Sequence, residues 1–179
     1  IMLMGSVTND EGLFQMPPRL WPREWTLDNY RHFSDIGRWA INSCLMSGGI
    51  LTLSVAVACV TSYVFAFHEF PGQRRLWPLL LAGLVVPMLL LMLPKFAVLM
   101  KLGLLDTRVG LILSQSLYPT AIYIARRFFD TVPPSIRDAA KIDGAGEFRT
   151  MVQIVLPICK PMVASLMIFA GVNALGDYL

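Results

Sequence analysis

Cysteine and histidine, the residue types most often used as nucleophiles or metal ligands, are few in this sequence of 179 residues. The three cysteines, Cys44, Cys59 and Cys159, are an odd number and lack C-x-x-C spacing. Each lies in or beside an apolar run, where a thiol packs as a small apolar group. Neither His32 nor His68 is near a cysteine or a pair of carboxylates, as a zinc site would require. We therefore predict no catalytic, metal-binding or cofactor-binding residue, and a protein that is not an enzyme.

Residues 132–161 have a more informative pattern, VPPSIRDAAKIDGAGEFRTMVQIVLPICKP. Two prolines stop the preceding helix, and Ser135 with Asp138 three residues later forms a helix-capping pattern. A helix of about two turns is predicted over 136–143. Gly144 is placed to end it in the left-handed conformation.

A second helix is predicted over 147–156, with Pro157 ending it or marking a bend. Its apolar residues recur at the spacing of one helix face; they are Phe148, Met151, Val152 and Val155. Two short helices joined by a glycine turn suit an element that transmits movement from a partner to the rest of the protein. The alternative is an ordinary amphipathic linker at a membrane surface.

The elements that must position this segment are predicted to cross a membrane. The sequence is 55% hydrophobic and 15% charged, whereas a soluble domain has about 25% charged residues. A membrane-spanning helix needs about 20 apolar residues, and the candidate runs are 39–67, 76–94, 109–125 and 161–176. We predict an all-α, polytopic membrane helix bundle. A large soluble helical core is the alternative, and uncharged runs of this length are hard to place in so small a domain.

The predicted organisation has two parts. Residues 1–38 hold the end of a first span and a polar segment outside the membrane, and we expect the sequence to be a fragment of a longer chain. Residues 39–179 form the transmembrane domain, with a loop over 126–156. Of the 15 Lys and Arg residues, seven fall on one predicted side of the membrane and eight on the other. The positive-inside rule therefore does not decide the topology.

The run Asp138-Ala139-Ala140, followed by Gly144 and by Ile154-x-Leu156-Pro157, resembles the EAA loop of permeases from ATP-binding-cassette (ABC) importers. The family pattern is E-A-A, three residues, G, nine residues, I-x-L-P, and the spacing here matches at each step. The string AKIDGA is similar to the sugar-uptake class of the maltose-permease type. Strings in 18–30, 70–72 and 101–107 also resemble this class, so the resemblance covers nearly the whole chain. Asp138 departs from the usual Glu and keeps the carboxylate.

This resemblance implies a fragment of a six-span permease in the cytoplasmic (inner) membrane of a bacterium, with the loop over 126–156 in the cytoplasm. It implies an imported carbohydrate, or a related polyol or sugar phosphate. The implied partners are ABC ATPase subunits, a second permease subunit, an extracytoplasmic solute-binding protein and membrane lipid, but no nucleic acid. ATP and Mg would bind the ATPase subunits and no cofactor this chain, which lacks the GxxxxGK[ST] pattern.

The resemblance also implies a mechanism, in which closure of the ATPase dimer moves the loop and switches the spans between inward-open and outward-open states. The coupling residues that it implies are Asp138, Ala139, Ala140, Asp143, Gly144, Ile154, Leu156 and Pro157. The alternative is an ion- or proton-coupled secondary carrier. Such a carrier asks for ionisable residues within the spans, and the runs 39–67 and 109–125 have none.

Overall fold

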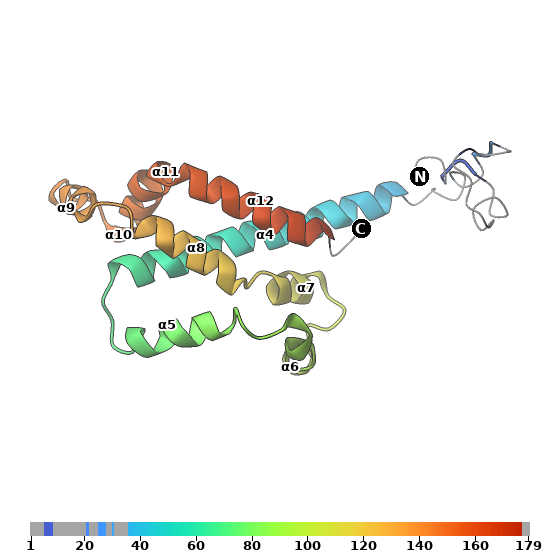
Figure 1. Cartoon of the computed structure of the whole chain (residues 1–179), viewed down its shortest axis with the longest axis horizontal. Coiled ribbons are helices and arrows are strands. Elements are labelled where there is room, and N and C mark those ends of the chain that lie inside the picture. The colour runs from blue at the N-terminus through green and yellow to red at the C-terminus, as the bar shows by residue number, and fades with distance from the viewer. Residues whose placement is uncertain (1–5, 9–20, 22–24, 28–29, 31–35, 177–179) are drawn as a thin grey trace. The chain divides into compact units, whose positions relative to one another are not determined.

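The computed structural model describes residues 6–8, 21, 25–27, 30 and 36–176, in two compact units that cover 1–42 and 43–179 (Figure 1). In the first unit, Thr8 and Trp25 form an isolated antiparallel bridge, and the backbone N–H of Thr26 donates to the carbonyl of Val7 at 3.0 Å. The hydroxyl of Tyr30 donates to Ser6 at 2.7 Å. The described part of the predicted polar segment is thus folded back on itself.

Helix α4 (Ile36–Phe67) is 32 residues long and contains the whole uncharged run 39–67. At about 1.5 Å per residue it exceeds the thickness of a bilayer core. Among the described residues, α4 is the one helix that is long and apolar enough to cross a membrane by itself. Gly49 allows another helix to approach closely, because a Cβ there would lie 2.6 Å from the Cδ1 of Ile112. Small residues at such positions are typical of closely packed membrane helices.

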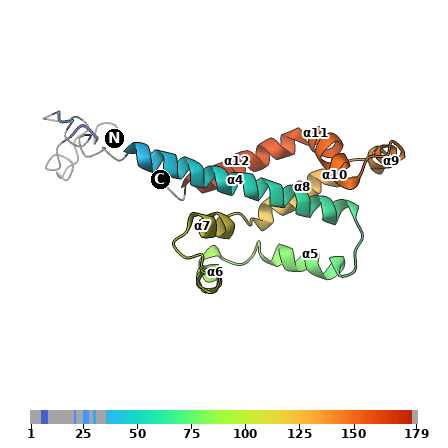
Figure 2. The same ribbon diagram turned by 180° about the vertical axis from the view of Figure 1, so that it is seen from behind.

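The runs 76–94 and 109–125 do not form the single spanning helices that we predicted. The first is divided into α5 (Gln73–Ala82) and α6 (Met88–Lys101), and the second into α7 (Arg108–Gln115) and α8 (Pro119–Phe129). Both views show α6 nearly end-on and α5 lengthwise (Figures 1 and 2). Proline causes both breaks, since it lacks an N–H and keeps the preceding residue out of the helical region. Tyr118, before Pro119, is accordingly extended, with φ −115° and ψ 105°.

The last helix, α12 (Lys160–Gly176), corresponds to the predicted run 161–176. It packs beside α8, and α8 also contacts α5. A buried apolar cluster joins α4, α8 and α12; its largest fully buried side chains are Phe129, Met162, Leu166 and Val155. Cys59 and Cys159 belong to this cluster as the sequence predicted, whereas Cys44 is exposed.

Between α8 and α12 lie the short elements of the predicted loop. They are α9 (Pro134–Ile142), α10 (Glu147–Thr150), the π-helical turn η2 (Met151–Val155) and α11 (Leu156–Ile158). Residues 147–158 run as one continuous helical segment that meets α12 at an angle of 86°. If this bent pair counts as one span, the described residues contain two candidate spans rather than the four predicted from composition.

Candidate functional site

The two ends of helix α9 are stabilised in different ways. It begins at Pro134, a favourable first helical position for proline, and no side chain caps it. The predicted Ser135–Asp138 capping pattern is therefore wrong, because the helix starts one residue before Ser135. The predicted end is confirmed: Gly144 has φ +76°. Its N–H donates to the carbonyl of Lys141 at 3.1 Å, and that of Ala145 donates to Ala140 at 2.9 Å, which is a Schellman motif.

The second predicted helix does form, but its exposed and buried faces differ from the prediction. Met151 and Val155 are buried at 7% and 0% exposure, whereas Phe148 and Val152 are 76% and 41% exposed. The π-helical turn over η2 changes the angular spacing of side chains, so an apolar pattern at i, i+3, i+4, i+7 no longer shares one face. Phe148 is consequently presented to the outside of this chain.

The predicted coupling residues lie on two different kinds of surface. Asp138, Ala139, Asp143 and Gly144 are exposed, as is Pro157 at the start of α11. Ala140 is only 3% exposed. Ile154 and Leu156 are half-buried, and Leu156 packs against the apolar cluster. The motif residues up to Gly144 are thus exposed, apart from Ala140. Ile154 and Leu156, near the end of the motif, attach the loop to the helices of the apolar cluster.

The exposed side of α9 also carries a large apolar side chain. Ile142 is 87% exposed and lies beside Asp143, at the end of the helix away from Pro134. Together with Ala139 it gives the outer surface of a short helix an apolar character. Both views place α9 at an end of the second unit, next to α10 (Figures 1 and 2).

The sequence did not identify Glu147, which is the centre of the strongest polar cluster in this region. Its Oε2 accepts a hydrogen bond from the hydroxyl of Tyr63 at 3.1 Å and lies 3.4 Å from Nε2 of His68. Its Oε1 lies 3.4 Å from Nη2 of Arg137 and 3.4 Å from Nζ of Lys141. One carboxylate therefore contacts α4, the residue just after it, and α9. We call these five residues the Glu147 cluster.

Arg137 connects this cluster to the end of α4. Its Nη1 donates to the backbone carbonyl of Phe67, the last residue of α4, at 2.9 Å. The guanidinium carbon also lies 4.8 Å from the ring centroid of Phe67. Because α4 has no basic residue in its own last turn, Arg137 supplies the positive charge that favours a helix C-terminus. The Arg137 side chain is 13% exposed, which strengthens both contacts.

The electrostatic environment keeps Glu147 ionised. Burial by itself raises the pKa of Glu147, but the hydrogen bonds from Tyr63 and Lys141 and the charges of Arg137 and His68 outweigh it. The pKa of this carboxyl consequently lies below its ordinary value. The signal available in the sequence was weak: Arg137 and Lys141 are four residues apart on one helix, but Tyr63 lies 84 residues from Glu147.

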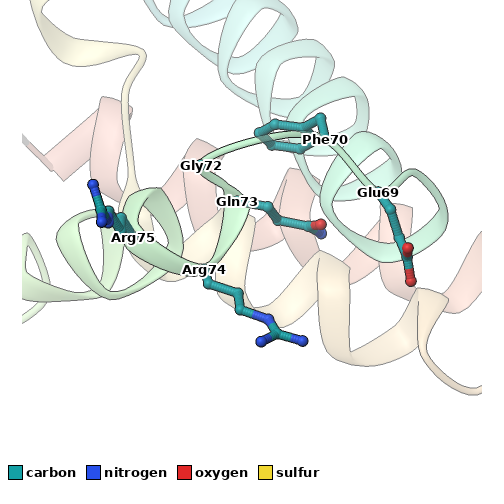
Figure 3. A pocket seen from close by; sticks show the side chains of 6 residues that line it. All are labelled: Glu69, Phe70, Gly72, Gln73, Arg74 and Arg75. Carbon is teal, nitrogen blue, oxygen red and sulfur yellow. The ribbon is translucent and has the colours of Figure 1, made fainter.

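A cavity of about 450 Å³ lies where α4 is followed by α5, and Figure 3 shows its lining. The side chains of Arg74 and Arg75 point in different directions there, and Glu69 lies on the opposite side. Gln73 donates to the carbonyl of Phe65 at 2.8 Å, so its role is to hold the turn. The two arginines do not converge on a common point, and this cavity does not form an anion site.

Comparison with known proteins identifies relatives that belong to membrane transport systems. Residues 50–179 match the family described as "Binding-protein-dependent transport system inner membrane component". The diacetylchitobiose uptake system permease protein NgcG of Streptomyces coelicolor is 35% identical over 99% of this chain and 60% of its own length. The maltodextrin transport system permease protein MdxG of Bacillus subtilis is 32% identical over 87% of this chain and 58% of its own length.

A more distant relative and a solved structure extend this similarity. The sn-glycerol-3-phosphate transport system permease protein UgpE of Yersinia pestis is 28% identical over the whole chain and 67% of its own length. The crystal structure of a bacterial ABC transporter involved in the import of the acidic polysaccharide alginate matches with a TM-score of 0.81. It covers 97% of this chain and 62% of the matched chain at 20% identity, which shows a common fold.

These comparisons confirm the resemblance drawn from the loop motif and the all-α permease fold. The chain spans about 60% of the length of the first of these curated relatives. The matched residues include α5 to α12, the whole loop over 126–156 and all five residues of the Glu147 cluster. Since the match extends over most of the sequence, this chain belongs to the family of binding-protein-dependent transport system inner membrane components.

Proposed function

We propose that this chain is part of the transmembrane permease subunit of an ATP-driven importer in the cytoplasmic membrane of a bacterium. Its relatives are permeases of uptake or transport systems for diacetylchitobiose, maltodextrin and sn-glycerol-3-phosphate. The proposed cargo is accordingly a carbohydrate or a related polyol or sugar phosphate. The proposed partners are ABC ATPase subunits, a second permease subunit and an extracytoplasmic solute-binding protein.

The observation that carries this proposal is the geometry of α9. The helix presents Asp138, Ala139 and Ile142 outward, and the Schellman motif at Gly144 fixes its end. Ile142 is 87% exposed outside the apolar runs, so burial of its side chain against another protein would be favourable. Small residues beside it allow a groove on that protein to approach the helix backbone closely.

In this proposal the chain performs no chemistry itself. ATP and Mg bind the ATPase subunits, and closure of the ATPase dimer displaces α9. The displacement changes the packing of the transmembrane helices between an inward-open and an outward-open arrangement, as a rigid-body two-state transition. The loop over 126–156 is cytoplasmic, because that is where the ATPase subunits bind.

Reconstitution tests the proposal. The full-length permease is placed in proteoliposomes with its second permease, its ATPase subunits and its solute-binding protein. Uptake is then measured for maltodextrin, diacetylchitobiose and sn-glycerol-3-phosphate as probes. We expect uptake of at least one probe that requires ATP inside and the binding protein outside. Uptake that an ion or proton gradient drives without ATP would overturn the proposal.

A further inference from the structure

The Glu147 cluster joins the end of α4 to α9 and α10, which lie far from it in the sequence, and none of its members belongs to the predicted coupling residues. Tyr63 and His68 lie at the end of α4 and just after it, Arg137 and Lys141 lie on α9, and Glu147 begins α10. We propose that Glu147 is a positioning residue that locks α9 to the end of α4, so that movement of α9 is passed directly to this long spanning helix. This inference rests on the proposed function, because it names the path by which the loop acts on a span.

The backbone holds one end of α9 less firmly than the other. At its beginning, Val132 is buried in the apolar cluster and Ile136 packs against it. The two prolines at 133 and 134 also restrict the backbone there. The segment 143–146, which follows the helix, has glycines at 144 and 146. Without the contacts of Glu147, a push on this end of α9 would be absorbed by rotation within 143–146 rather than moving α4.

The contacts of Glu147, in contrast, use both of its carboxylate oxygens. Oε1 faces Arg137 and Lys141 on α9, and Oε2 faces Tyr63 and His68 at the end of α4. The carboxylate thus lies between the two elements and contacts each with a different oxygen. A single rigid group with partners on both sides resists sliding of one element past the other.

Arg137 adds a second and independent connection. Its guanidinium bonds the carbonyl of Phe67 through Nη1 and approaches Glu147 through Nη2, and the planar fork fixes the angle between these directions. A lysine at this position would keep the charge but lose the fixed geometry. Helix α9 is therefore attached to α4 in two ways, through the contacts of Glu147 and through the direct hydrogen bond from Arg137 to Phe67.

The distance between the two elements gives the most direct test. Spin labels are placed at Val64→Cys on α4 and Ser135→Cys on α9, both exposed in this chain and outside the proposed coupling residues, in a full-length permease without its native cysteines and within the assembled transporter. We expect one narrow distance distribution that is the same with and without nucleotide. In Glu147→Gln, which keeps the size of the side chain, we expect a broader or shifted distribution. A distribution unchanged by Glu147→Gln would overturn the inference.

The amount of solute imported per ATP hydrolysed is a second measurement. A residue that only stabilised the fold would not change it. In Glu147→Gln we expect the amount of solute imported per ATP hydrolysed to fall about threefold to tenfold, because the carboxylate is 43% exposed and each of its several contacts contributes modestly. ATP hydrolysis itself should stay close to that of the parent. Arg137→Lys should give a defect between those of the parent and Glu147→Gln, because lysine keeps the positive charge but lacks the planar geometry of the guanidinium.

Glu69→Gln is the matched control, since it neutralises an exposed carboxylate next to His68 that forms no ion pair within the described residues. It should leave both readouts unchanged. Normal coupling in Glu147→Gln, with ATP-driven uptake intact in the parent, would overturn this inference and leave the proposed function standing. Absence of ATP-driven uptake in the parent would instead overturn the proposed function.

Discussion

Helices α4 and α9 are in contact through the Glu147 cluster, yet they are held in place by different forces. α4 has 32 residues and is uncharged from 39 to 67, and the cluster of apolar side chains around Ala58, Cys59 and Tyr63 fixes its position. α9 has nine residues, buries Ala140 and packs Ile136 against the same cluster. The rest of its position depends on a glycine turn and on ionic contacts. A helix held by packing along much of its length and a helix held largely by a few polar contacts respond differently to single substitutions.

In the proposed permease, this difference would let one element move without loosening the rest. Apolar packing is spread over many contacts, so no single contact controls α4. The polar contacts of α9 are few and directional, and each of them controls where this end of the helix lies.

Gly144→Val should have the largest effect. Residue 144 has φ +76°, which a β-branched side chain tolerates poorly, and the Schellman hydrogen bonds depend on it. Strain and lost bonds together should cost about 3 kcal/mol. We expect normal membrane insertion but abolished uptake with continued ATP hydrolysis. Gly146→Val is the matched control, because Gly146 has φ −69° and no atom would lie within 4 Å of its Cβ; equal defects in both variants would contradict this explanation.

Arg137→Met should come next. It removes the hydrogen bond to the carbonyl of Phe67 and the ion pair with Glu147, both at a side chain that is 13% exposed. The attachment of α9 should weaken by about 1.5–3 kcal/mol. Limited proteolysis of the assembled transporter should then cut 130–146 faster than in the parent. The comparison variant is Arg149→Met, since Arg149 is exposed and bonds only Gln153 in the described region; the same increase in cleavage there would refute a specific role for Arg137.

Gly49→Leu tests the packing of α4 and should have an intermediate effect. A larger side chain would push against Ile112, whose Cδ1 lies 2.6 Å from the position of an added Cβ. Overpacking of this kind costs about 1–3 kcal/mol. We expect a lower thermal unfolding temperature in detergent, with ATP coupling less affected than stability. Gly48→Leu has open space around it and should be nearly silent; a comparable loss of thermal stability at both positions would rule out the contact with Ile112 as the cause.

Tyr63→Phe should have the smallest effect. It removes one hydroxyl that donates to Glu147 at 3.1 Å and leaves the apolar ring and the other partners of the carboxylate in place. The expected cost is about 0.5–1.5 kcal/mol. The amount of solute imported per ATP should fall slightly, and much less than in Glu147→Gln. A defect as large as that of Glu147→Gln would mean that the Tyr63 hydroxyl, rather than the ion pairs, holds α9.

Much of the loop was predictable because its turns depend on a few residue types. Gly144 marks a left-handed position, and Pro133 with Pro134 marks the preceding helix end, so α9 and its following turn were expected nearly as they are. The burial of Ala140 was not predictable, since neighbouring alanines give no sign of which one faces the protein. The π-helical turn that exposes Phe148 has no sequence pattern of its own.

The broken helices and the Glu147 cluster were missed for different reasons. Pro87 and Pro119 were visible, but proline within an apolar run is compatible either with a bent span or with two helices. Choosing between these requires knowledge of neighbouring helices. The contacts of Glu147 with Tyr63 and of Arg137 with Phe67 join residues 84 and 70 positions apart. Such contacts follow from the tertiary structure and leave no periodicity in one sequence.

Crosslinking is the most direct test of whether the outer surface of α9 contacts an ATPase subunit. Ile142→Cys or Ala139→Cys is introduced into a full-length permease without its native cysteines and combined with a cysteine-bearing cognate ATPase subunit. Ala140→Cys is the matched control, because Ala140 is 3% exposed and Ile142 is 87% exposed. We expect a crosslink at Ile142 and Ala139 that changes with nucleotide, and little or none at Ala140. No crosslink at the exposed positions in an assembled complex would contradict this expectation.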